Sequence, residues 1–370
     1  MVRKGENTRM KTQKSITRNP LDRRSFVRGS LVAGGAAVMG VGLLSSSPAF
    51  GQDSDDRKRG LNRGDSAILR FLAAAELIEA DLWTQYAELG GVTGSSMNPY
   101  QTAFTNLDGD GMQYITSNTL DEVSHADFLN AYLESKGADP VNLDAFRQLQ
   151  GSKATGAKNI GRLTNLMHLT VDTSWYTRYR STTNPDFGAT FPQAIDINNR
   201  SAIPVTDADF DNSTHIQAIA DIAAFHFGSI EQGGTSLYAA LSQKVSGAEV
   251  LEITLGIGGS EIAHFLEWVD FAGNAVQGPP ITDQGLTFPN FNNPPNPQLQ
   301  TNLIFPIPCE FINPNLPKCA VIRPLTDQNA GAVAAVKSLT GSGLFMGQSK
   351  QFFATLQQLA IEADEARRSS

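Results

Sequence analysis

Basic residues are scarce beyond the start of this chain, and cysteine and histidine are rare throughout. The 370 residues contain 29 Lys and Arg, 37 Asp and Glu, 5 His and 2 Cys. The first 51 residues hold nine of the basic residues but only two of the acidic ones, which leaves a net charge near −15 beyond them (20 − 35). Such a surface repels nucleic acid phosphates and anionic lipids. The charge balance therefore argues against a nucleic-acid partner and suits a protein that attracts cations.

Several motifs of other protein classes are also absent from the sequence. It has no phosphate-binding glycine loop, no nucleophile elbow and no CxxC pair. The two cysteines, Cys309 and Cys319, stand in a segment rich in proline and asparagine without a cluster of other metal-ligating residues nearby, so they do not predict a zinc site. In an oxidising compartment they would close a short loop, and the alternative is a pair of free thiols.

The N-terminal segment has the features of an export signal. Arg23-Arg24 is followed by a weakly apolar run over Leu31–Leu44 and then by small residues at Ala49 and Gly51. This order is typical of a twin-arginine signal peptide with a cleavage site before Gln52. The apolar run is shorter than the roughly 20 residues that a membrane-spanning helix needs. We therefore expect export to the periplasm or beyond, with no membrane span left after processing.

Helical patterns dominate the rest of the chain. Caps, apolar spacing and glycine stops predict four long helices and two shorter ones near the C-terminus. The expected ranges are Asp65–Leu89, Gly111–Lys136, Thr214–Val245, Ala248–Ala272, 327–340 and 349–367. Residues Asp144–Leu169 also read as mostly helical, with a break near Gly151–Gly156. Strand signals are few, and the clearest are the short apolar runs Leu303–Phe305 and Ala320–Ile322. The sequence thus predicts an all-α fold class.

These patterns predict a four-part organisation of the chain. Residues 1–51 form the signal peptide, 52–64 a linker, 65–273 a four-helix bundle and 274–370 a C-terminal extension. Inside the bundle segment, residues 171–213 contain several prolines and glycines and are expected to form a loop excursion without regular structure.

Two copies of a Glu-x-x-His pattern provide candidate metal ligands. They are Glu122-Val-Ser-His125 and Glu261-Ile-Ala-His264, and both lie within predicted helices. Residues three apart share one face of a helix, so each pair presents a carboxylate and an imidazole to the same point. The other two long helices carry a second repeat, in which Glu79-x6-Tyr86 on the first resembles Glu231-x6-Tyr238 on the third. One Glu from each of two helices and a Glu-x-x-His pair from each of the other two are the ligand set of a di-metal bundle.

The acidic residues of these motifs fall on predicted core faces. In the first helix, Leu72, Glu76, Glu79 and Trp83 follow 4-3-4 spacing. Buried carboxylates without partners are costly and repel one another, and few Arg or Lys residues lie on these helices to neutralise them. Divalent cations would relieve that repulsion. Glu76 and Glu79 compete for the position on the first helix. The x6-Tyr repeat favours Glu79, whereas the family resemblance given below favours Glu76, which is our first choice.

The motifs resemble those of the ferritin-like superfamily, and in particular a bacterial ferritin-like family related to desiccation-related proteins. The first helix, Glu76-Leu-Ile-Glu79-Ala-Asp-Leu82-Trp83, is similar to that family's Glu-x-x-Glu-x-x-aromatic-aromatic pattern. The third helix, Glu231-Gln-Gly-Gly234-Thr-Ser-Leu-Tyr238, is similar to its Glu-x-x-Gly-x-x-x-Tyr pattern. The likeness covers about residues 65–273. It implies a ferritin-like four-helix bundle and a centre of two Fe or Mn ions.

This resemblance assigns expected roles to the motif residues. Glu122 and Glu261 would bridge the two metals, while Glu76 (or Glu79) and Glu231 would each bind one. His125 and His264 would each bind one metal, and Tyr86 and Tyr238 would act as hydrogen-bond donors or radical sinks beside the centre. The list of metal ligands is therefore Glu76, Glu79, Glu122, His125, Glu231, Glu261 and His264.

Two functions fit these expectations. The first is a redox centre that reacts with a small oxidant such as peroxide or oxygen in stress protection, as an oxidase, a peroxidase or a manganese catalase-like enzyme. The second is a non-catalytic desiccation or stress protein whose bundle holds metal structurally or not at all. Homo-oligomers are compatible with both.

Overall fold

The computed structural model describes residues 60–94, 96–178, 192–293, 306–307, 315, 317, 319–320 and 331–368. The twin-arginine pattern and Cys309 lie outside these residues, so the expectations about export and the disulfide remain predictions. All of the described helices and strands belong to one compact unit, Ser54–Ser370.

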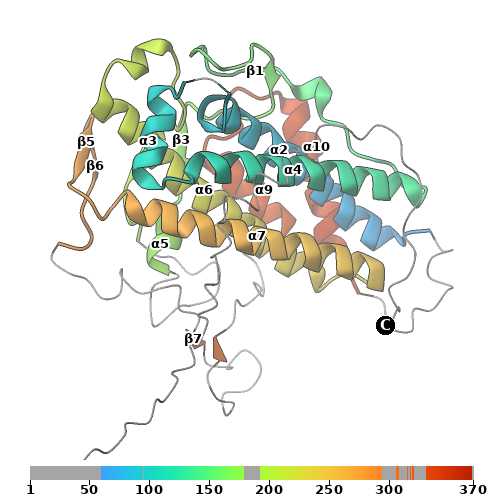
Figure 1. The fold of residues 1–370 in the computed structure, drawn as a ribbon. Coiled ribbons are helices and arrows are strands. Elements are labelled where there is room, and N and C mark those ends of the chain that lie inside the picture. The colour runs from blue at the N-terminus through green and yellow to red at the C-terminus, as the bar shows by residue number, and fades with distance from the viewer. Residues whose placement is uncertain are drawn as a thin grey trace, which may run out of the picture. The chain divides into compact units, whose positions relative to one another are not determined.

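Four long helices form the centre of this unit. They are α2 (Arg63–Gly90), α4 (Gly111–Ser135), α6 (Ser213–Ser242) and α7 (Ala248–Asn274). They run side by side, with α2 packed on α4 and α6 packed on α7 (Figure 1). The mostly helical structure confirms the all-α fold class, and each of these helices lies within a few residues of its predicted range.

Polar caps define where the helices begin. Asn62 caps α2 by accepting a hydrogen bond from the Asp65 amide, and Asn212 caps α6 by accepting from Thr214 and His215. The Asp65 carboxylate reaches across to the turn between α6 and α7, where it accepts from the amides of Ser246 and Gly247 at 2.8 Å each. One buried carboxylate therefore ties the start of α2 to the start of α7.

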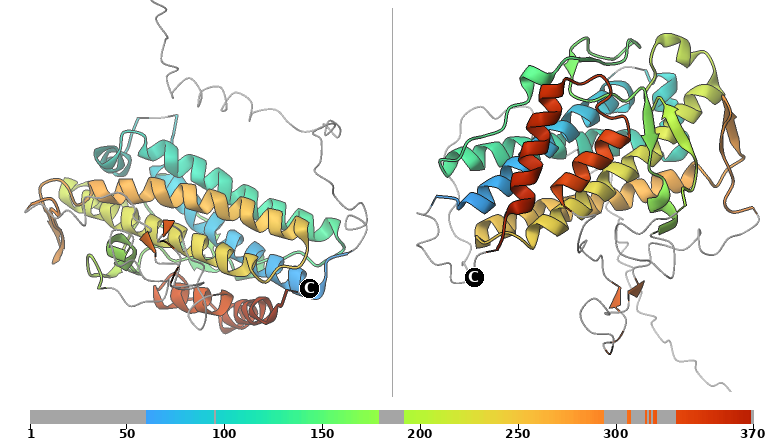
Figure 2. Two further views of the ribbon diagram at one scale, coloured as in Figure 1. Left: turned by 90° about the horizontal axis from the view of Figure 1, so that it is seen from below. Right: turned by 180° about the vertical axis from the view of Figure 1, so that it is seen from behind.

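Two C-terminal helices cover one side of the bundle. They are α9 (Ala332–Gly341) and α10 (Lys350–Glu365), near the predicted ranges. The view from behind in Figure 2 shows them over α2 and α6, on the side away from α4 and α7. Buried Phe352, Leu356 and Leu359 pack α10 against this side, so these helices belong to the same hydrophobic core as the bundle.

The remaining elements are short. They are α3 (Pro99–Leu107), α5 (Ser174–Arg178), the 3-10 turns η2 (Asp144–Phe146) and η3 (Asp207–Phe210), and the strands β1 (Leu149–Gln150), β2 (Gly161–Arg162), β3 (Leu169–Val171), β4 (Ile197–Arg200), β5 (Ile281–Asp283), β6 (Leu286–Phe288), β7 (Pro306–Ile307) and β8 (Cys319–Ala320). The strands form four antiparallel pairs, β1–β2, β3–β4, β5–β6 and β7–β8. The β7–β8 pair adjoins the two predicted apolar runs, most of whose residues lie outside the described ones.

The prediction of helix over Asp144–Leu169 was wrong. Apart from η2, the segment is extended and contains β1, β2 and the start of β3. A buried carboxylate binds backbone groups of this segment. Asp81 of α2 accepts hydrogen bonds from the amides of Leu163 and Thr164, both at 3.0 Å, and forms an ion pair with Arg147 at 2.7 Å. Backbone donors that a helix would use internally are thus bound to a side chain of another helix.

Two further expectations about the connections need correction. We predicted no helix between residues 91 and 110, but α3 lies there and begins with a capping box formed by Asn98 and Gln101. The excursion 171–213 was expected to lack regular structure, but its described part contains α5, β4 and η3. Strand β4 pairs with β3 through Leu169 and Arg200, so the return of this excursion is anchored to its start.

Candidate metal centre

Each long helix contributes carboxylates to one point in the bundle interior. Glu76 comes from α2 and Glu231 from α6, while α4 and α7 contribute the pairs Glu122–His125 and Glu261–His264. All four glutamates are at most 1% exposed, and His264 is 5% exposed. The sequence places them there because each lies on the apolar stripe that its helix turns toward the core.

The side chains form two overlapping groups. Glu76, Glu122, His125 and Glu261 offer one ligand atom each within 4.8 Å of one another, and so do Glu122, Glu231, Glu261 and His264. Glu122 and Glu261 belong to both groups. A pair of shared carboxylates between two sets of oxygen and nitrogen donors is the geometry that holds two adjacent cations.

Within the described residues, several of these inward atoms have no hydrogen bond apart from imidazole–carboxylate contacts of 3.1–3.8 Å. They are Glu76 Oε2, Glu231 Oε2, both carboxylate oxygens of Glu261 and His264 Nδ1. An unpaired buried polar atom costs about 1–3 kcal/mol, and more when it is charged. Such atoms directed at one point fit a bound cation, because metal coordination would satisfy all of them together.

Protons offset part of the charge in the absence of a cation. Burial raises the pKa of Glu76 to about 8, although its hydrogen bond with His125 opposes this. Burial and the charge of Glu122 likewise raise the pKa of Glu231 and of Glu261. The cluster therefore favours protonated carboxyls when no metal compensates their charge.

The shared glutamate on α4 behaves in the opposite way. Burial would raise the pKa of Glu122, but hydrogen bonds with His125 and His264 outweigh it and lower the pKa to about 2. These contacts measure 3.3 Å to His125 Nδ1 and 3.1 Å to His264 Nδ1. They also raise the pKa of His125 to about 10 against the effect of burial. Metal binding at these nitrogens would release the protons that they hold.

Each imidazole has a second partner on the facing helix. His125 Nε2 lies 3.2 Å from Ser260 Oγ, and His264 Nε2 lies 3.1 Å from Asp121 Oδ2. Ser260 directly precedes Glu261, and Asp121 directly precedes Glu122. With Nε2 bound in this way, the Nδ1 atom of each ring faces the glutamates. Outer hydrogen-bond partners orient metal-binding histidines in the same manner.

The carboxylates of α2 and α6 also have partners from other helices. The Tyr238 hydroxyl of α6 donates a hydrogen bond to Glu76 Oε1. Asn118 donates to Glu231 Oε1 at 3.1 Å and to Glu122 Oε1 at 3.0 Å, and Trp268 donates to Asn118 at 2.8 Å. These bonds fix one oxygen of each carboxylate and leave the other directed at the centre.

Two of the predicted residues lie to one side of the cluster. Glu79 is one turn along α2 from Glu76 and belongs to neither group of ligands. The hydrogen bond of Tyr86 goes to His226 Nδ1 at 2.7 Å rather than to one of the glutamates. Of the competing acids on α2, Glu76 belongs to a donor group and Glu79 does not, so Glu76 remains our first choice.

Sequence reasoning missed the outer partners Asn118, Asp121 and Ser260 in that role. Asn118 stands one turn before Glu122 on the same face, and this spacing could have indicated it. Asp121 and Ser260 each directly precede a Glu-x-x-His motif. This shared position becomes informative only after the hydrogen-bond partner of each histidine is known.

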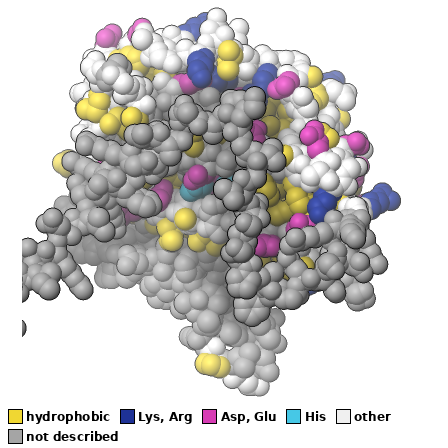
Figure 3. Space-filling view, turned by 45° about the vertical axis from the view of Figure 1, so that its right-hand side comes forward, with side chains coloured by type: hydrophobic (Ala, Val, Ile, Leu, Met, Phe, Trp, Pro, Cys, Tyr) yellow, Lys and Arg dark blue, Asp and Glu magenta, His cyan; other side chains and the backbone are white. Residues whose placement is uncertain are grey.

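Basic side chains do not neutralise the cluster within the part of the chain that the structure describes. Arg70 of α2 pairs with Glu362, and Lys136 of α4 pairs with Glu249. In the space-filling view of Figure 3, a histidine is visible beside an acidic side chain, and the basic side chains of that face lie elsewhere. The negative charge at the centre is left for protons or cations to balance.

Comparison with known proteins identifies a family. A family model described as a ferritin-like domain matches residues 64–272, which cover the four long helices except for the first residue of α2 and the last two of α7. No curated protein and no solved structure matches the chain. None of the described helices combines the length and the apolar character needed to cross a bilayer.

Proposed function

Because the chain belongs to the ferritin-like domain family, we propose that its buried cluster binds two ions of iron or manganese and uses them in redox chemistry. One observation carries this proposal: two groups of four donors share Glu122 and Glu261. A structural site for a single ion would need only one such group.

The proposed ligand set follows from the two groups. Glu122 and Glu261 would bridge, with Glu76 and His125 completing one site and Glu231 and His264 the other. Four carboxylates balance the charge of two divalent ions, and each imidazole adds one neutral nitrogen donor. Iron or manganese bound there would supply electron transfer to a small oxidant such as peroxide or oxygen.

The chain's own residues would set the conditions for this chemistry. Tyr238 holds Glu76 through its Oε1 atom, and Asn118 holds Glu231 through its Oε1 atom, so each carboxylate is oriented before a ligand arrives. The packed rings of Trp83, Phe227 and Trp268, whose centroids lie 4.6–5.3 Å apart, form an apolar wall in the same part of the core. Such a wall limits the access of water to one side of the centre.

We further propose that the protein acts after export by the twin-arginine route, in protection against oxidative or drying stress. The support is the N-terminal arginine pair followed by a short apolar run and small residues. A route that carries folded proteins suits a metal centre that is assembled before transport.

The test uses protein purified from its native export route. Elemental analysis is expected to give about two ions of iron or manganese per chain, in line with the two donor groups. The reduced protein should then consume peroxide over many turnovers. Release of oxygen without an added electron donor would identify the catalase form of this chemistry, and consumption only with a donor would identify the peroxidase form.

Two results would overturn the proposal. A metal content below one ion per chain would contradict the di-metal centre itself. Two bound ions without any turnover of peroxide or oxygen would instead support a structural role. Glu252→Gln, an exposed glutamate of α7, is the matched control for any ligand variant, because it makes the same chemical change outside the cluster.

A further inference from the structure

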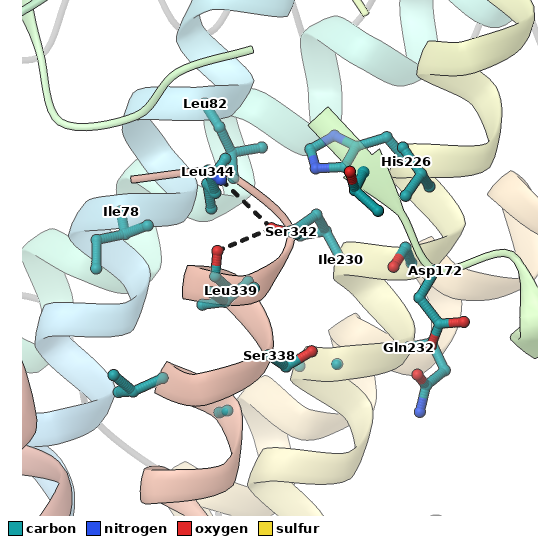
Figure 4. A pocket seen from close by; sticks show the side chains of 18 of the residues that line it. Ile78, Leu82, Asp172, His226, Ile230, Gln232, Ser338, Leu339, Ser342 and Leu344 are labelled. Atoms are coloured by element: carbon teal, nitrogen blue, oxygen red, sulfur yellow. Dashed lines mark hydrogen bonds between the residues drawn. The ribbon is translucent and has the colours of Figure 1, made fainter. Parts of the chain in front are cut away.

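A cavity lies beside the metal centre, between α2, α6, α9 and the β3–β4 pair. Its volume is about 470 Å³, and apolar side chains such as Ile78, Leu82, Ile230 and Leu339 form much of its wall (Figure 4). This volume falls in the range of about 300–1,000 Å³ that is usual for sites of small organic ligands. The size and the lining both fit a compact apolar molecule.

One polar side chain faces this cavity without a partner for its outer nitrogen. His226 of α6 is 2% exposed, and its ring points toward Leu82 and Leu344 across the cavity (Figure 4). Its Nε2 atom has no hydrogen bond within the described residues. Glu79 also lines the cavity, and its Oε2 atom is a second buried polar atom without a hydrogen bond. A largely apolar cavity with a few unsatisfied buried groups is the arrangement expected of a specific ligand site.

The hydrogen bond of Tyr86 determines which proton His226 offers. Burial lowers the pKa of His226 to about 3, so the ring is neutral and carries one proton. The Tyr86 hydroxyl lies 2.7 Å from Nδ1. We assign Tyr86 as the donor of this bond, because Nδ1 is the hydrogen-bond partner of its buried hydroxyl within the described residues. The proton of the ring is then on Nε2, and His226 presents an N–H donor to the cavity.

Acidic side chains at the cavity indicate the charge of its ligand. Asp172 and the exposed Asp196 lie on the wall, and Glu79 lines it on the side of α2. The carboxylates of Asp172 and Asp196 disfavour an anion by charge repulsion. A neutral molecule with an oxygen that accepts a hydrogen bond matches both the charge and the donor.

We propose that this cavity binds a small, neutral, apolar organic molecule through a hydrogen bond from His226 Nε2–H to a carbonyl or ether oxygen of the ligand. Such binding requires no metal and goes beyond the redox function. The cavity is nevertheless adjacent to the centre: Gly234 lines it, and a side chain at that position would collide with Glu261.

The first experiment compares two ligands of nearly the same shape. 1-Acetylnaphthalene has a carbonyl oxygen where 1-isopropenylnaphthalene has a methylene group. Their affinities are measured by equilibrium dialysis against the full chain, before and after removal of metal with a chelator. We expect 1-acetylnaphthalene to bind about fivefold more tightly in both preparations, the effect of one hydrogen bond to a buried donor. Equal affinities, or no binding to metal-free protein, would overturn the inference.

The second experiment fills the cavity. Gly233 of α6 is exposed, lines the cavity, and has open space where a Cβ would lie, so Gly233→Phe introduces a ring without a backbone clash. Gly256→Phe of α7 is the matched control, because Gly256 is also exposed, has the same open space and does not line the cavity. Thermal unfolding checks that both variants fold.

We expect Gly233→Phe to weaken the binding of 1-acetylnaphthalene at least tenfold and Gly256→Phe to leave it unchanged. Unchanged binding in Gly233→Phe, or equal loss in both variants, would overturn the site. Because dialysis is performed on metal-free protein as well, a failure here is distinct from a failure of the proposed di-metal function.

Discussion

In the α2–α4 half of the bundle, a helix with one buried ligand glutamate precedes a helix with Glu-x-x-His, and the α6–α7 half repeats this order. The two halves supply equivalent ligands: Glu76 corresponds to Glu231, and the Glu122–His125 pair corresponds to Glu261–His264. Their outer partners differ. His264 contacts the carboxylate of Asp121, whereas His125 contacts the hydroxyl of Ser260.

This difference makes the two proposed metal positions unequal. A carboxylate on the far nitrogen makes an imidazole a more basic ligand than a hydroxyl does. The ligand atoms alone would make the two metal sites equivalent. The contact of His264 with the Asp121 carboxylate favours tighter metal binding at the site that His264 completes.

The halves also differ one turn beyond the ligand glutamate. The α2 helix has Glu79 three residues after Glu76, whereas the α6 helix has Gly234 three residues after Glu231. Glycine is required there because a Cβ would collide with Glu261. The first half thus carries an extra carboxylate at the position where the second half brings two helices into close contact.

Loss of a shared ligand should have the largest effect and should remove the difference between the halves. We expect Glu261→Gln to reduce the metal content from about two ions to below one, because both donor groups use this carboxylate. Glu76→Gln should retain about one ion, since only one group uses Glu76. Elemental analysis measures both, with Glu252→Gln as the control. Equal metal loss in the two ligand variants would contradict shared coordination.

Changes to the outer partners should have an intermediate effect and test the asymmetry directly. Asp121→Asn is expected to weaken one metal site about 10- to 100-fold, the range for loss of such a partner. Ser260→Ala should weaken the other site less than Asp121→Asn weakens its own, because a neutral hydroxyl contributes less than a carboxylate. Competition with a chelator, fitted to two sites, measures both. The same loss in both variants would show that the second contacts do not distinguish the halves.

Removal of the extra carboxylate should have the smallest effect and depend on pH. Burial and the charges of Glu122 and Glu76 raise the pKa of Glu79 well above its ordinary value. The folded protein therefore holds a proton that the unfolded chain has lost, so this group destabilises the metal-free fold increasingly as pH rises above about 4.5.

We expect Glu79→Gln to raise the melting temperature of metal-free protein by roughly 5 °C at about pH 8 and by less at about pH 5. Calorimetry at both pH values measures the change. The exposed Glu365→Gln of α10 is the control and should have no such pH dependence. A stabilisation that is equal at both pH values would exclude ionisation of Glu79 as its cause.

The long helices and the inward ligands were accessible to sequence reasoning because both follow local periodicity. A stripe such as Leu72, Glu76 and Trp83 places an acid on the core face of α2 through the helical repeat alone. The preference for Glu76 over Glu79 came from the family resemblance rather than from periodicity, since both acids are on that stripe, and Glu76 belongs to one of the two donor groups.

The connections depended on long-range contacts that no local pattern contains. The segment 144–169 is extended because Asp81, more than sixty residues earlier, binds the amides of Leu163 and Thr164. Likewise, the pairing of His264 with Asp121 joins residues that are 143 positions apart. Such contacts are set by tertiary packing, which overrides local preference.

The position of α10 determines how this protein can be divided for experiments. The carboxylate of Asp364 accepts from the first amides of α9, Ala332 at 3.0 Å and Val333 at 2.9 Å, and also binds Lys244 of α6 at 3.1 Å. A fragment ending at 272, where the family match stops, would expose the apolar surface that Phe352 and its neighbours cover. It would be prone to aggregate. Expression vectors should therefore extend past Ala366, so that they encode more than the region that the family model matches.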